Sequence, residues 1–366
     1  MSSRKWTEIW IVSVMGIFIL VFVFNYIVDP YGSNRIFKYE FNKIKKQLDE
    51  RSEKLELIKS AKYNTFIFGS SRNTVIDPEL IDDNLMSSKT INVAFGGATI
   101  VEIESYFKYI MSNHINIKNI FIGLDLFAFS DVFTARRVES TEDLLGSITS
   151  RFNIKTFFQP EYLSYKTLVD SVSVIKGNKS SVVKCNKKCA SYKQKGMRYY
   201  KEFLESKEYD IKKHVTDVRP YWKVDSFAID RVEILKRILK ESAKNNISAF
   251  VYTNPLTFQQ IYSGNGTNNF AFLTQLDLLE EIVRGTEIGI YDFNNLNSVN
   301  FDNNYFVNQF HFNYKVADCI INKITLGTSS CGGNFGEFVD ERNIKKYKET
   351  IKEKFTELRA DYDRPT

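Results

Sequence analysis

The sequence predicts an α/β protein with a parallel central sheet, preceded by one N-terminal transmembrane helix. Three features predict it: a charge-free apolar run near the N-terminus, a series of short apolar segments that end in small or polar turns, and helical periodicity between those segments. Apolar runs without polar alternation are typical of strands buried on both faces, as in parallel sheets covered by helices. Because such sheets bind ligands at the carboxyl ends of their strands, we expect the turns after the strands to share one crevice.

The composition excludes several other classes of protein. The chain has 366 residues, of which 30 are Phe and 20 are Tyr, and such an aromatic content is incompatible with overall disorder. The net charge of +6 comes from 50 basic and 44 acidic residues, an excess too small to indicate nucleic-acid binding without a basic motif. Only three histidines are present, which leaves little room for a histidine-rich metal site.

The apolar run covers residues 10–28, which are 19 residues without charge. As a helix it would measure about 28 Å, close to the thickness of the hydrocarbon core of a bilayer. A cleaved signal peptide would have a shorter apolar core and a small-residue cleavage site, and residues 25–30 offer no such site. We therefore expect an uncleaved anchor that follows a cytoplasmic tail of residues 1–9.

The orientation of this anchor follows from weaker signals. Arg4 and Lys5 favour a cytoplasmic N-terminus, but Arg35, Lys38 and Lys43 lie just beyond the span, so the count of basic residues is close to a tie. The leading residues are too few to form a domain, and no second span follows. We therefore expect the rest of the chain to lie outside the cytoplasm.

The four cysteines agree with this location. They are Cys185, Cys189, Cys319 and Cys331, and an even number permits two disulfides, of which the local pairs are the simplest of three connectivities. A zinc site made of all four cysteines is the alternative.

The remaining chain divides into a linker, an alternating region and a C-terminal segment. Residues 29–64 are expected to form an amphipathic linker helix, and strands and helices then alternate over residues 65–326. The expected strands are 65–68, 89–94, 119–126, 248–252 and 288–293. The expected helices are 102–111, 228–244, with Asp225 and Ser226 as candidate caps, 273–283 and 313–324.

Two segments depart from this alternation. Between about 130 and 224 we expect an irregular insertion, which carries nine basic residues and no acidic residue between positions 171 and 201. That run is either a solvated loop or a surface for anionic lipid headgroups or an anionic glycan. Residues 327–366 are expected to form a Gly/Ser/Cys linker and a C-terminal docking helix with one apolar face.

One combination of residues could support catalysis. The turn at residues 69–72 places Ser71 where a strand meets a predicted helix N-terminus, whose backbone N–H groups favour developing negative charge. A serine nucleophile also needs an imidazole to take its proton, and His311 could reach the same crevice. The alternatives are that the serine caps a helix and that His311, between two phenylalanines, is a core histidine.

Six short blocks give the chain a family resemblance. They are VDPYG at 28–32, FGSSR at 68–72, NVAFGGA at 92–98, GLDLF at 123–127, YDF at 291–293 and FHF at 310–312. In this order they resemble the SGNH (GDSL-like) hydrolase superfamily, and the layout is similar to membrane-anchored bacterial envelope proteins such as the D-alanyl-lipoteichoic acid transfer protein and the alginate O-acetyltransferase group. The resemblance implies a flavodoxin-like three-layer SGNH fold over residues 65–326.

The resemblance also assigns roles to individual residues. Ser71 is expected to be the nucleophile and His311 the general base, while the backbone N–H groups of Ser71 and Gly97 are expected to bind the oxyanion. Arg72 and Asp125 complete the residues expected around the oxyanion or the substrate. The family usually has Asn at the position of Asp125, and a carboxylate there would repel an oxyanion, so we expect Asp125 to have a structural role such as capping.

A second departure concerns the orientation of the histidine. Asn308 stands where the family has the Asp that orients the imidazole and stabilises the imidazolium. Asn can accept the same hydrogen bond but supplies no charge, and the corresponding change in a serine protease costs about 10⁴ in turnover, or roughly 5.5 kcal/mol. Asp302 or Asp292 could supply the missing carboxylate.

These features lead to two hypotheses about function. The first is an extracytoplasmic esterase or O-acyltransferase, which acts on acetyl-like esters of an envelope polysaccharide or teichoic-acid-type polymer through an acyl-serine intermediate, without cofactor, metal or nucleic acid. It would sit as a single-pass protein in the bacterial cytoplasmic membrane, with its C-terminal domain in the periplasm or at the cell surface. The second is a catalytically degenerate scaffold that binds envelope glycan or docks on a membrane-bound acyltransferase or a polysaccharide-synthesis complex.

Overall fold

The computed structural model describes residues 3–30, 50–60, 63–86, 88–113, 116–130, 160–180, 195, 197, 226–262, 271–308 and 310–362. The chain forms two compact units. The first unit is Met1–Glu56 with Asp143–Cys185, and the second is Leu57–Glu142 with Asn186–Thr366.

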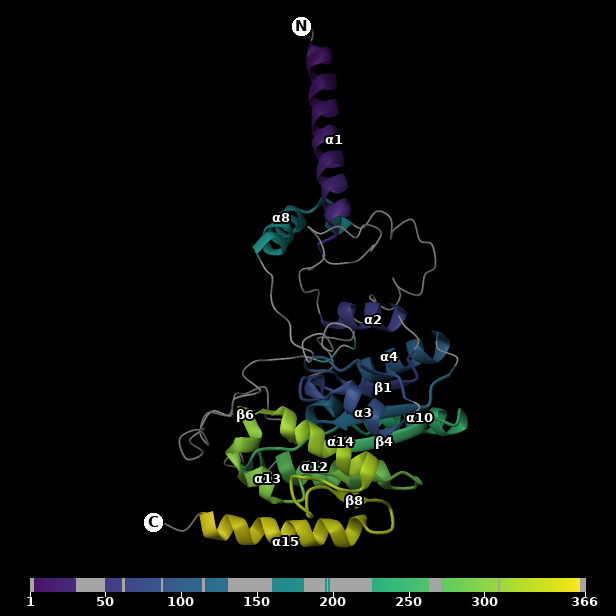
Figure 1. The fold of residues 1–366 in the computed structure, drawn as a ribbon, viewed down its shortest axis with the longest axis vertical. Helices are drawn as coiled ribbons and strands as arrows, with labels where there is room; N and C mark the ends of the chain where they lie inside the picture. Colours follow the sequence, from purple (N-terminus) through teal and green to yellow (C-terminus); the bar gives the residue numbers. More distant parts are fainter. Residues whose placement is uncertain are drawn as a thin grey trace. The chain divides into compact units, whose positions relative to one another are not determined.

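The first unit is built around the N-terminal helix α1 (Ser3–Val28). The 3₁₀-helix η4 (Pro160–Leu163) and helix α8 (Tyr165–Ser180) pack against it (Figure 1). Helix α1 is long and apolar enough to cross a membrane, and only 11% of its most apolar window is buried. The predicted span of residues 10–28 lies entirely within this helix. Helix α8 corrects the expectation that the insertion has no regular structure.

The second unit is built on a six-stranded sheet with the order β2-β1-β3-β4-β5-β8 (Figure 1). The first five strands in this unit pair in parallel, and β8 pairs antiparallel to β5 at one edge. The prediction of a mostly parallel sheet is therefore confirmed. The strands are β1 (Thr65–Phe68), β2 (Thr90–Asn92), β3 (Asn119–Leu124), β4 (Ser248–Thr253), β5 (Ile290–Asp292) and β8 (Glu337–Val339).

The central strands are apolar throughout because both of their faces are covered. All four residues of β1 are buried, and so are all but the first of β3. Ile67, Phe121 and Tyr252, on neighbouring strands, belong to one core cluster together with residues of the helices α3 and α14. The cluster also contains Val75 and Ile76, so the segment that follows β1 is packed into the core.

The helices around the sheet fall into two groups. Helices α4, α10, α12 and α15 pack one against the next, whereas α3 packs against α14. Strand β1 has β2 on one side and β3 on the other, so the crossovers β1–α3–β2 and β2–α4–β3 run in opposite directions along the sheet. Because crossovers between parallel strands are right-handed, α3 and α4 lie on opposite faces of the sheet. Besides α1 and α8, the helices are α2 (Glu50–Ser60), α3 (Pro78–Asn84), α4 (Ile100–Asn113), α10 (Ile229–Lys244), α11 (Phe258–Tyr262), α12 (Ala271–Val283), α13 (Ser298–Phe301), α14 (Tyr314–Leu326) and α15 (Ile344–Tyr362).

The predicted helix ends agree with the structure in some helices and differ in others. Helix α10 begins after Ala228 without a side-chain cap, so the prediction that Ser226 caps it is wrong, and the other candidate, Asp225, lies outside the described residues. The ends of α14 follow sequence signals, because the side chain of Asn313 accepts the N–H of Val316 and Gly327 ends the helix at φ 73°.

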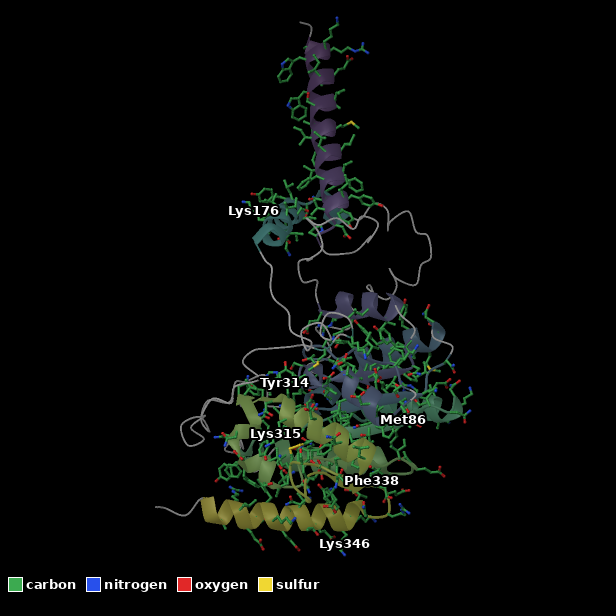
Figure 2. The ribbon with its side chains drawn as sticks, viewed as in Figure 1. Met86, Lys176, Tyr314, Lys315, Phe338 and Lys346 are labelled. Atoms are coloured by element: carbon green, nitrogen blue, oxygen red, sulfur yellow. A yellow bond between two sulfur atoms is a disulfide. The ribbon has the colours of Figure 1, made fainter. Side chains whose placement is uncertain are left out.

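The C-terminal segment contains more structure than predicted. Strand β8 lies inside the segment expected to be a linker. The apolar face of α15 is buried in its own domain, where the ring of Phe355 lies 5.3 Å from that of Phe272 on α12. Figure 2 labels Phe338 of β8 and Lys346 of α15. The predicted docking helix therefore docks on its own domain through that face.

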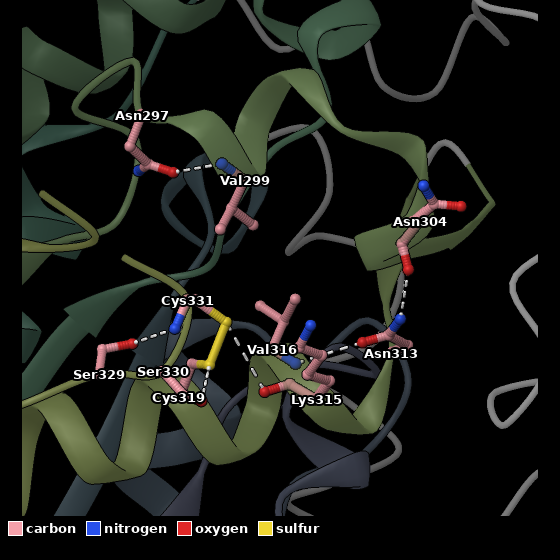
Figure 3. Close-up of a disulfide and its surroundings, with 10 residues drawn as sticks. All are labelled: Asn297, Val299, Asn304, Asn313, Lys315, Val316, Cys319, Ser329, Ser330 and Cys331. Atoms are coloured by element: carbon pink, nitrogen blue, oxygen red, sulfur yellow. Dashed lines mark hydrogen bonds between the residues drawn. A yellow bond between two sulfur atoms is a disulfide. The ribbon is translucent and has the colours of Figure 1, made fainter. Parts of the chain in front are cut away.

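A disulfide joins Cys319 of α14 to Cys331 in the following segment (Figure 3). This is one of the local pairs expected from the sequence, and it removes these two sulfurs from any zinc site. Cys185 and Cys189 lie outside the described residues, as do residues 31–49 of the predicted linker helix and most of the basic run.

Candidate active site

The turn after β1 carries Ser71. Gly69 has φ 144°, and the backbone N–H of Ser70 donates to Asn73 Oδ1 at 3.1 Å, so the chain folds sharply over the strand end. The next element is the 3₁₀-helix η2 (Asn73–Val75), and α3 begins only at Pro78. The predicted helix N-terminus at Ser71 is thus a single 3₁₀ turn, which provides backbone N–H groups but no long helix dipole.

A two-stranded hairpin brings His311 to this turn. Strands β6 (Phe306–Asn308) and β7 (His311–Phe312) pair antiparallel, with Asn308 opposite His311. Across 240 positions of sequence, His311 Nε2 lies 3.0 Å from Ser71 Oγ. Both residues are partly exposed, so the pair can be reached from solvent.

Hydrogen bonds to Asn308 determine the tautomer of the imidazole. The backbone N–H groups of Phe310 and His311 donate to Asn308 Oδ1 at 2.9 and 3.0 Å, which identifies this atom as the carbonyl oxygen of the amide. The same oxygen lies 3.0 Å from His311 Nδ1, so that nitrogen must carry the proton. Nε2 is then the acceptor that faces the Ser71 hydroxyl, which is the arrangement that a general base requires.

The imidazole is held in its neutral form. Burial, followed by the positive charge of Arg72, lowers the pKa of His311 from 6.5 to about 4, while Asp125 acts in the opposite direction. A neutral imidazole can accept a proton at neutral pH. The low pKa also means that the imidazolium formed after proton transfer is poorly stabilised, since the amide of Asn308 supplies no charge.

Arg72 connects three segments around the pair. Its Nε donates to the carbonyl of Phe310 at 2.7 Å, its Nη2 donates to Gln260 Oε1 at 3.0 Å, and its Nη1 pairs with Asp125 Oδ1. The guanidinium therefore fixes the His311 hairpin to the end of β3 and to α11. All three of its contacts are with the protein, which makes Arg72 a brace for the site rather than an open substrate ligand.

Asp125 is the buried counter-ion of Arg72. It occupies the N-cap position of the 3₁₀-helix η3 (Leu126–Phe129) without a capping hydrogen bond from its side chain, so the predicted capping role is wrong. Its second oxygen accepts from Asn254 Nδ2 at 3.0 Å. The expected structural role is met by this ion pair, which neutralises a carboxylate that would otherwise repel an oxyanion.

A network of buried amides, which the sequence did not predict, supports the turn. Asn73 donates to Tyr252 OH at 2.8 Å and to Asn254 Oδ1 at 2.9 Å, and no part of its side chain is exposed. A Cβ at Gly69 or Gly123 would lie about 2 Å from the Asn73 side chain, at 2.1 and 1.9 Å respectively. Gly123 within a buried strand was the one sequence signal for such a close approach.

Gly97 lies in the loop after β2, which is tied to the same turn. Phe95 donates its N–H to the carbonyl of Gly69 at 3.2 Å, and Asn92 donates its side-chain amide to the carbonyl of Asn73 at 2.8 Å. Gly97 follows two residues later with φ 62°, in the left-handed region that favours glycine. The loop is thus held beside the Ser71 turn.

The two carboxylates considered as substitutes for Asn308 make other contacts. Asp292 is completely buried and accepts from Thr253 Oγ1 at 2.5 Å and Tyr347 OH at 2.6 Å. Burial raises its pKa, against the lowering effect of these hydrogen bonds. Asp302 accepts from the N–H of Asn304 and caps the 3₁₀-helix η8 (Asn303–Tyr305). The interpretation of either as the acidic partner of His311 finds no support in these contacts.

Within the described residues, no group of three or more His, Cys, Asp or Glu side chains could hold a metal ion. No protein-family model matches the chain, and no curated protein matches it. The geometry of the site is therefore the basis for its chemistry.

Proposed function

We propose that the protein is a serine-dependent esterase or O-acyltransferase that works through an acyl-Ser71 intermediate. The observation that carries this proposal is the hydrogen bond between Ser71 Oγ and His311 Nε2, at 3.0 Å, in a tautomer fixed by Asn308. Two residues so distant in sequence would not meet in this way through capping alone, and a core histidine would not need a partly exposed hydroxyl as its partner.

The architecture supports the same proposal. The order 2-1-3-4-5 of the parallel strands is that of flavodoxin-like sheets, which bind ligands at the carboxyl ends of the strands. Ser71 follows β1, Gly97 follows β2 and Asp125 follows β3, so these three residues come from those ends, and the β6–β7 hairpin adds His311. This arrangement is consistent with the three-layer SGNH fold that the sequence blocks resemble.

The reaction would proceed in two halves. The Ser71 oxygen attacks the carbonyl carbon of an ester while His311 Nε2 takes the hydroxyl proton, and the backbone N–H groups of Ser71 and Gly97 receive the oxyanion. His311 returns the proton to the departing alcohol, which leaves the acyl group on Ser71. Water, or the hydroxyl of an acceptor, then attacks the acyl group with His311 again as the base.

The substrate class follows from location and resemblance. A chain anchored by α1 and carrying a disulfide in its folded domain fits an extracytoplasmic protein of the cytoplasmic membrane. Acetyl-like esters on an envelope polysaccharide or teichoic-acid-type polymer are the substrates that the resemblance implies, and a membrane-bound acyltransferase would be the partner that loads the serine.

Covalent labelling tests this proposal. A fluorophosphonate should attach to Ser71 of the full-length protein, and Ser71→Ala should remove the label. The matched control is Ser70→Ala in the same turn, because Ser70 Oγ accepts the N–H of Arg72 at 3.2 Å and has no contact with the imidazole given by the structure. Labelling that is absent from the folded wild type, or that survives in Ser71→Ala, would contradict the proposal.

One observation favours the scaffold hypothesis instead. His311 has a neutral partner and a pKa lowered to about 4, which together weaken it as a base. On this hypothesis the domain binds an envelope glycan or a membrane acyltransferase without acyl chemistry. A folded protein that binds polysaccharide with equal affinity before and after Ser71→Ala, and that takes no label, would select this alternative.

A further inference from the structure

Helix α8, in the first unit, turns polar side chains inward. Over residues 165–176, whose side chains the structure describes, the buried ones are Thr167, Asp170, Ser171 and Val174, which lie at the i, i+3, i+4 and i+7 positions of one helical face. Three of these four are polar. A helix on the surface of a water-soluble domain normally buries its apolar face instead.

The opposite face of α8 is exposed and carries apolar side chains together with Lys176. Tyr165, Val169 and Val172 are 80%, 47% and 38% exposed and form a stripe along the helix, and Leu163 precedes them at 41%. Outside α1, eight large hydrophobic side chains are exposed in the described residues, and half of them are these four. Their concentration on the adjoining elements η4 and α8 marks a surface that avoids water.

The polar groups of this unit satisfy one another internally. Asn25, which is fully buried near the end of the apolar helix α1, donates to the carbonyl of Tyr162 at 2.7 Å and accepts from Ser171 Oγ at 2.8 Å. The hydroxyl of Tyr162 donates to Asp29 Oδ1 at 3.2 Å. Polar side chains that face the protein interior, with apolar ones facing outward, are typical of proteins surrounded by lipid.

The contacts place α8 at one end of the candidate span. The ring of Tyr162 packs edge-on against Phe22 and Tyr26, at 6.0 and 5.7 Å, in the last two turns of α1. Trp6 and Trp10 are exposed near the other end of α1. Aromatic side chains at both ends of a span are typical of the two membrane–water interfaces. In a membrane spanned by α1, helix α8 would lie at the level of one interface.

We propose that η4 and α8 are embedded in the bilayer interface at the C-terminal end of α1, with Tyr165, Val169 and Val172 in contact with lipid. The 16 residues of α8 are too few to span the bilayer, which needs about 20. The exposed side chain of Lys176 (Figure 2) can extend from this face toward the lipid phosphates. The basic run of the sequence begins here, so the occupant is a bilayer that contains anionic lipid. This proposal depends on α1 crossing the membrane and not on the acyl chemistry.

Photo-crosslinking from the full-length protein in vesicles tests the proposal. The photoreactive residue p-benzoylphenylalanine is introduced as Tyr165→p-benzoylphenylalanine, which keeps an aromatic ring, and separately at Val169. The matched control is Ser173→p-benzoylphenylalanine, on the exposed polar side of the same helix. The vesicles contain phosphatidylethanolamine and phosphatidylglycerol, and the adducts are identified by mass spectrometry.

We expect lipid adducts at positions 165 and 169 in severalfold higher yield than at 173. Equal yields at the three positions, or no lipid adduct at any of them, would overturn the proposal. Crosslinks to a second copy of the chain would overturn it as well, since the apolar stripe would then be a protein interface. Circular dichroism of each variant reports folding, so a failure here is distinct from a failure of Ser71 to react.

Discussion

Two polar clusters lie at opposite ends of the same parallel sheet, and they differ in chemistry. At the amino ends, Thr65, Ser88 and Asn119 bond to one another at 3.0 to 3.3 Å. At the carboxyl ends, a hydroxyl faces an imidazole, and a guanidinium and a carboxylate are buried beside them. The hydroxyls and amides at the amino ends hold neighbouring strands together and have no further chemical role. A reactive site needs, in addition, a group that can change its protonation state next to the hydroxyl.

The largest expected difference between the two clusters concerns His311. We expect His311→Gln to slow fluorophosphonate labelling of Ser71 by about 10² to 10⁴, because the hydroxyl loses its base. Asn119→Ala, in the amino-end cluster, should change the rate by no more than about twofold. The labelling rates are measured on full-length protein. An equal loss in both variants would mean that general unfolding, and not the base, controls labelling.

The ion pairs at the two ends of the sheet should also differ in how much they contribute to the free energy of unfolding. Arg72 and Asp125 are 6% and 1% exposed, whereas Lys195 and Asp82, beside β2, are 26% and 21% exposed. Arg72→Ala leaves a buried carboxylate unpaired and should lower the free energy of unfolding by about 3–5 kcal/mol. Lys195→Ala should cost less than about 1 kcal/mol. Chemical denaturation checks both values, and similar costs would contradict the comparison.

A third prediction asks which carboxyl-end groups belong to the site. Tyr347→Phe removes a hydrogen bond to the buried Asp292 and should cost about 1–3 kcal/mol of stability. It should leave the labelling rate of Ser71 unchanged, because the structure gives Asp292 no contact with His311. If the stability loss appears together with a loss of labelling, the site extends as far as Asp292.

The last variant should gain labelling rate instead of losing it. Asn308→Asp places a negative charge beside the imidazole, which should raise the pKa of His311 and speed labelling by about tenfold for each pKa unit of added imidazolium stabilisation. In the wild type the neutral imidazole persists until the pH falls to about 4, so the acid limb of the pH–rate profile should lie there. In the variant the limb should move to higher pH. A limb that stays in place would show that Asn308 does not control the base.

The same pKa has a consequence for stability. The pKa of His311 is lowered from 6.5 to about 4 in the folded state. The contribution of His311 to the free energy of unfolding is therefore present above pH 6.5 and is lost as the pH falls through about 4. Acid therefore destabilises the fold through this residue, and His311→Gln should flatten the dependence of the denaturation midpoint over that range.

The sequence predicted the parts of the fold that depend on local pattern. The parallel strands, the helices α4, α10, α12 and α14 and the apolar N-terminal helix follow from periodicity and apolar runs, whereas the shorter helix α3 was not predicted. The edge strand β8 could not be found in this way, because a strand of three residues carries too short a pattern. The buried polar face of α8 could not be predicted either, because its partner, Asn25, lies on another helix far away in the sequence.

The candidate site, like the fold, could be predicted from the sequence only in part. Ser71 and His311 were singled out because few residue types can act as nucleophile and base, and the structure places them together. The pairing of Arg72 with Asp125 was missed, because the sequence shows two charges 53 positions apart and nothing of their common burial. Asn73 was missed for a similar reason: an asparagine after a turn is ordinary, and only the close approach of two glycines reveals its place.

Direct trapping of the acyl-enzyme tests the central claim. Full-length protein is mixed with excess p-nitrophenyl acetate, stopped with acid after short intervals and digested for peptide mass spectrometry. The account predicts one acetyl group on the peptide that contains Ser71, formed ahead of product turnover and absent from Ser71→Ala. A folded wild-type protein that carries no acetyl group on that peptide, or carries it equally in Ser71→Ala, would contradict it.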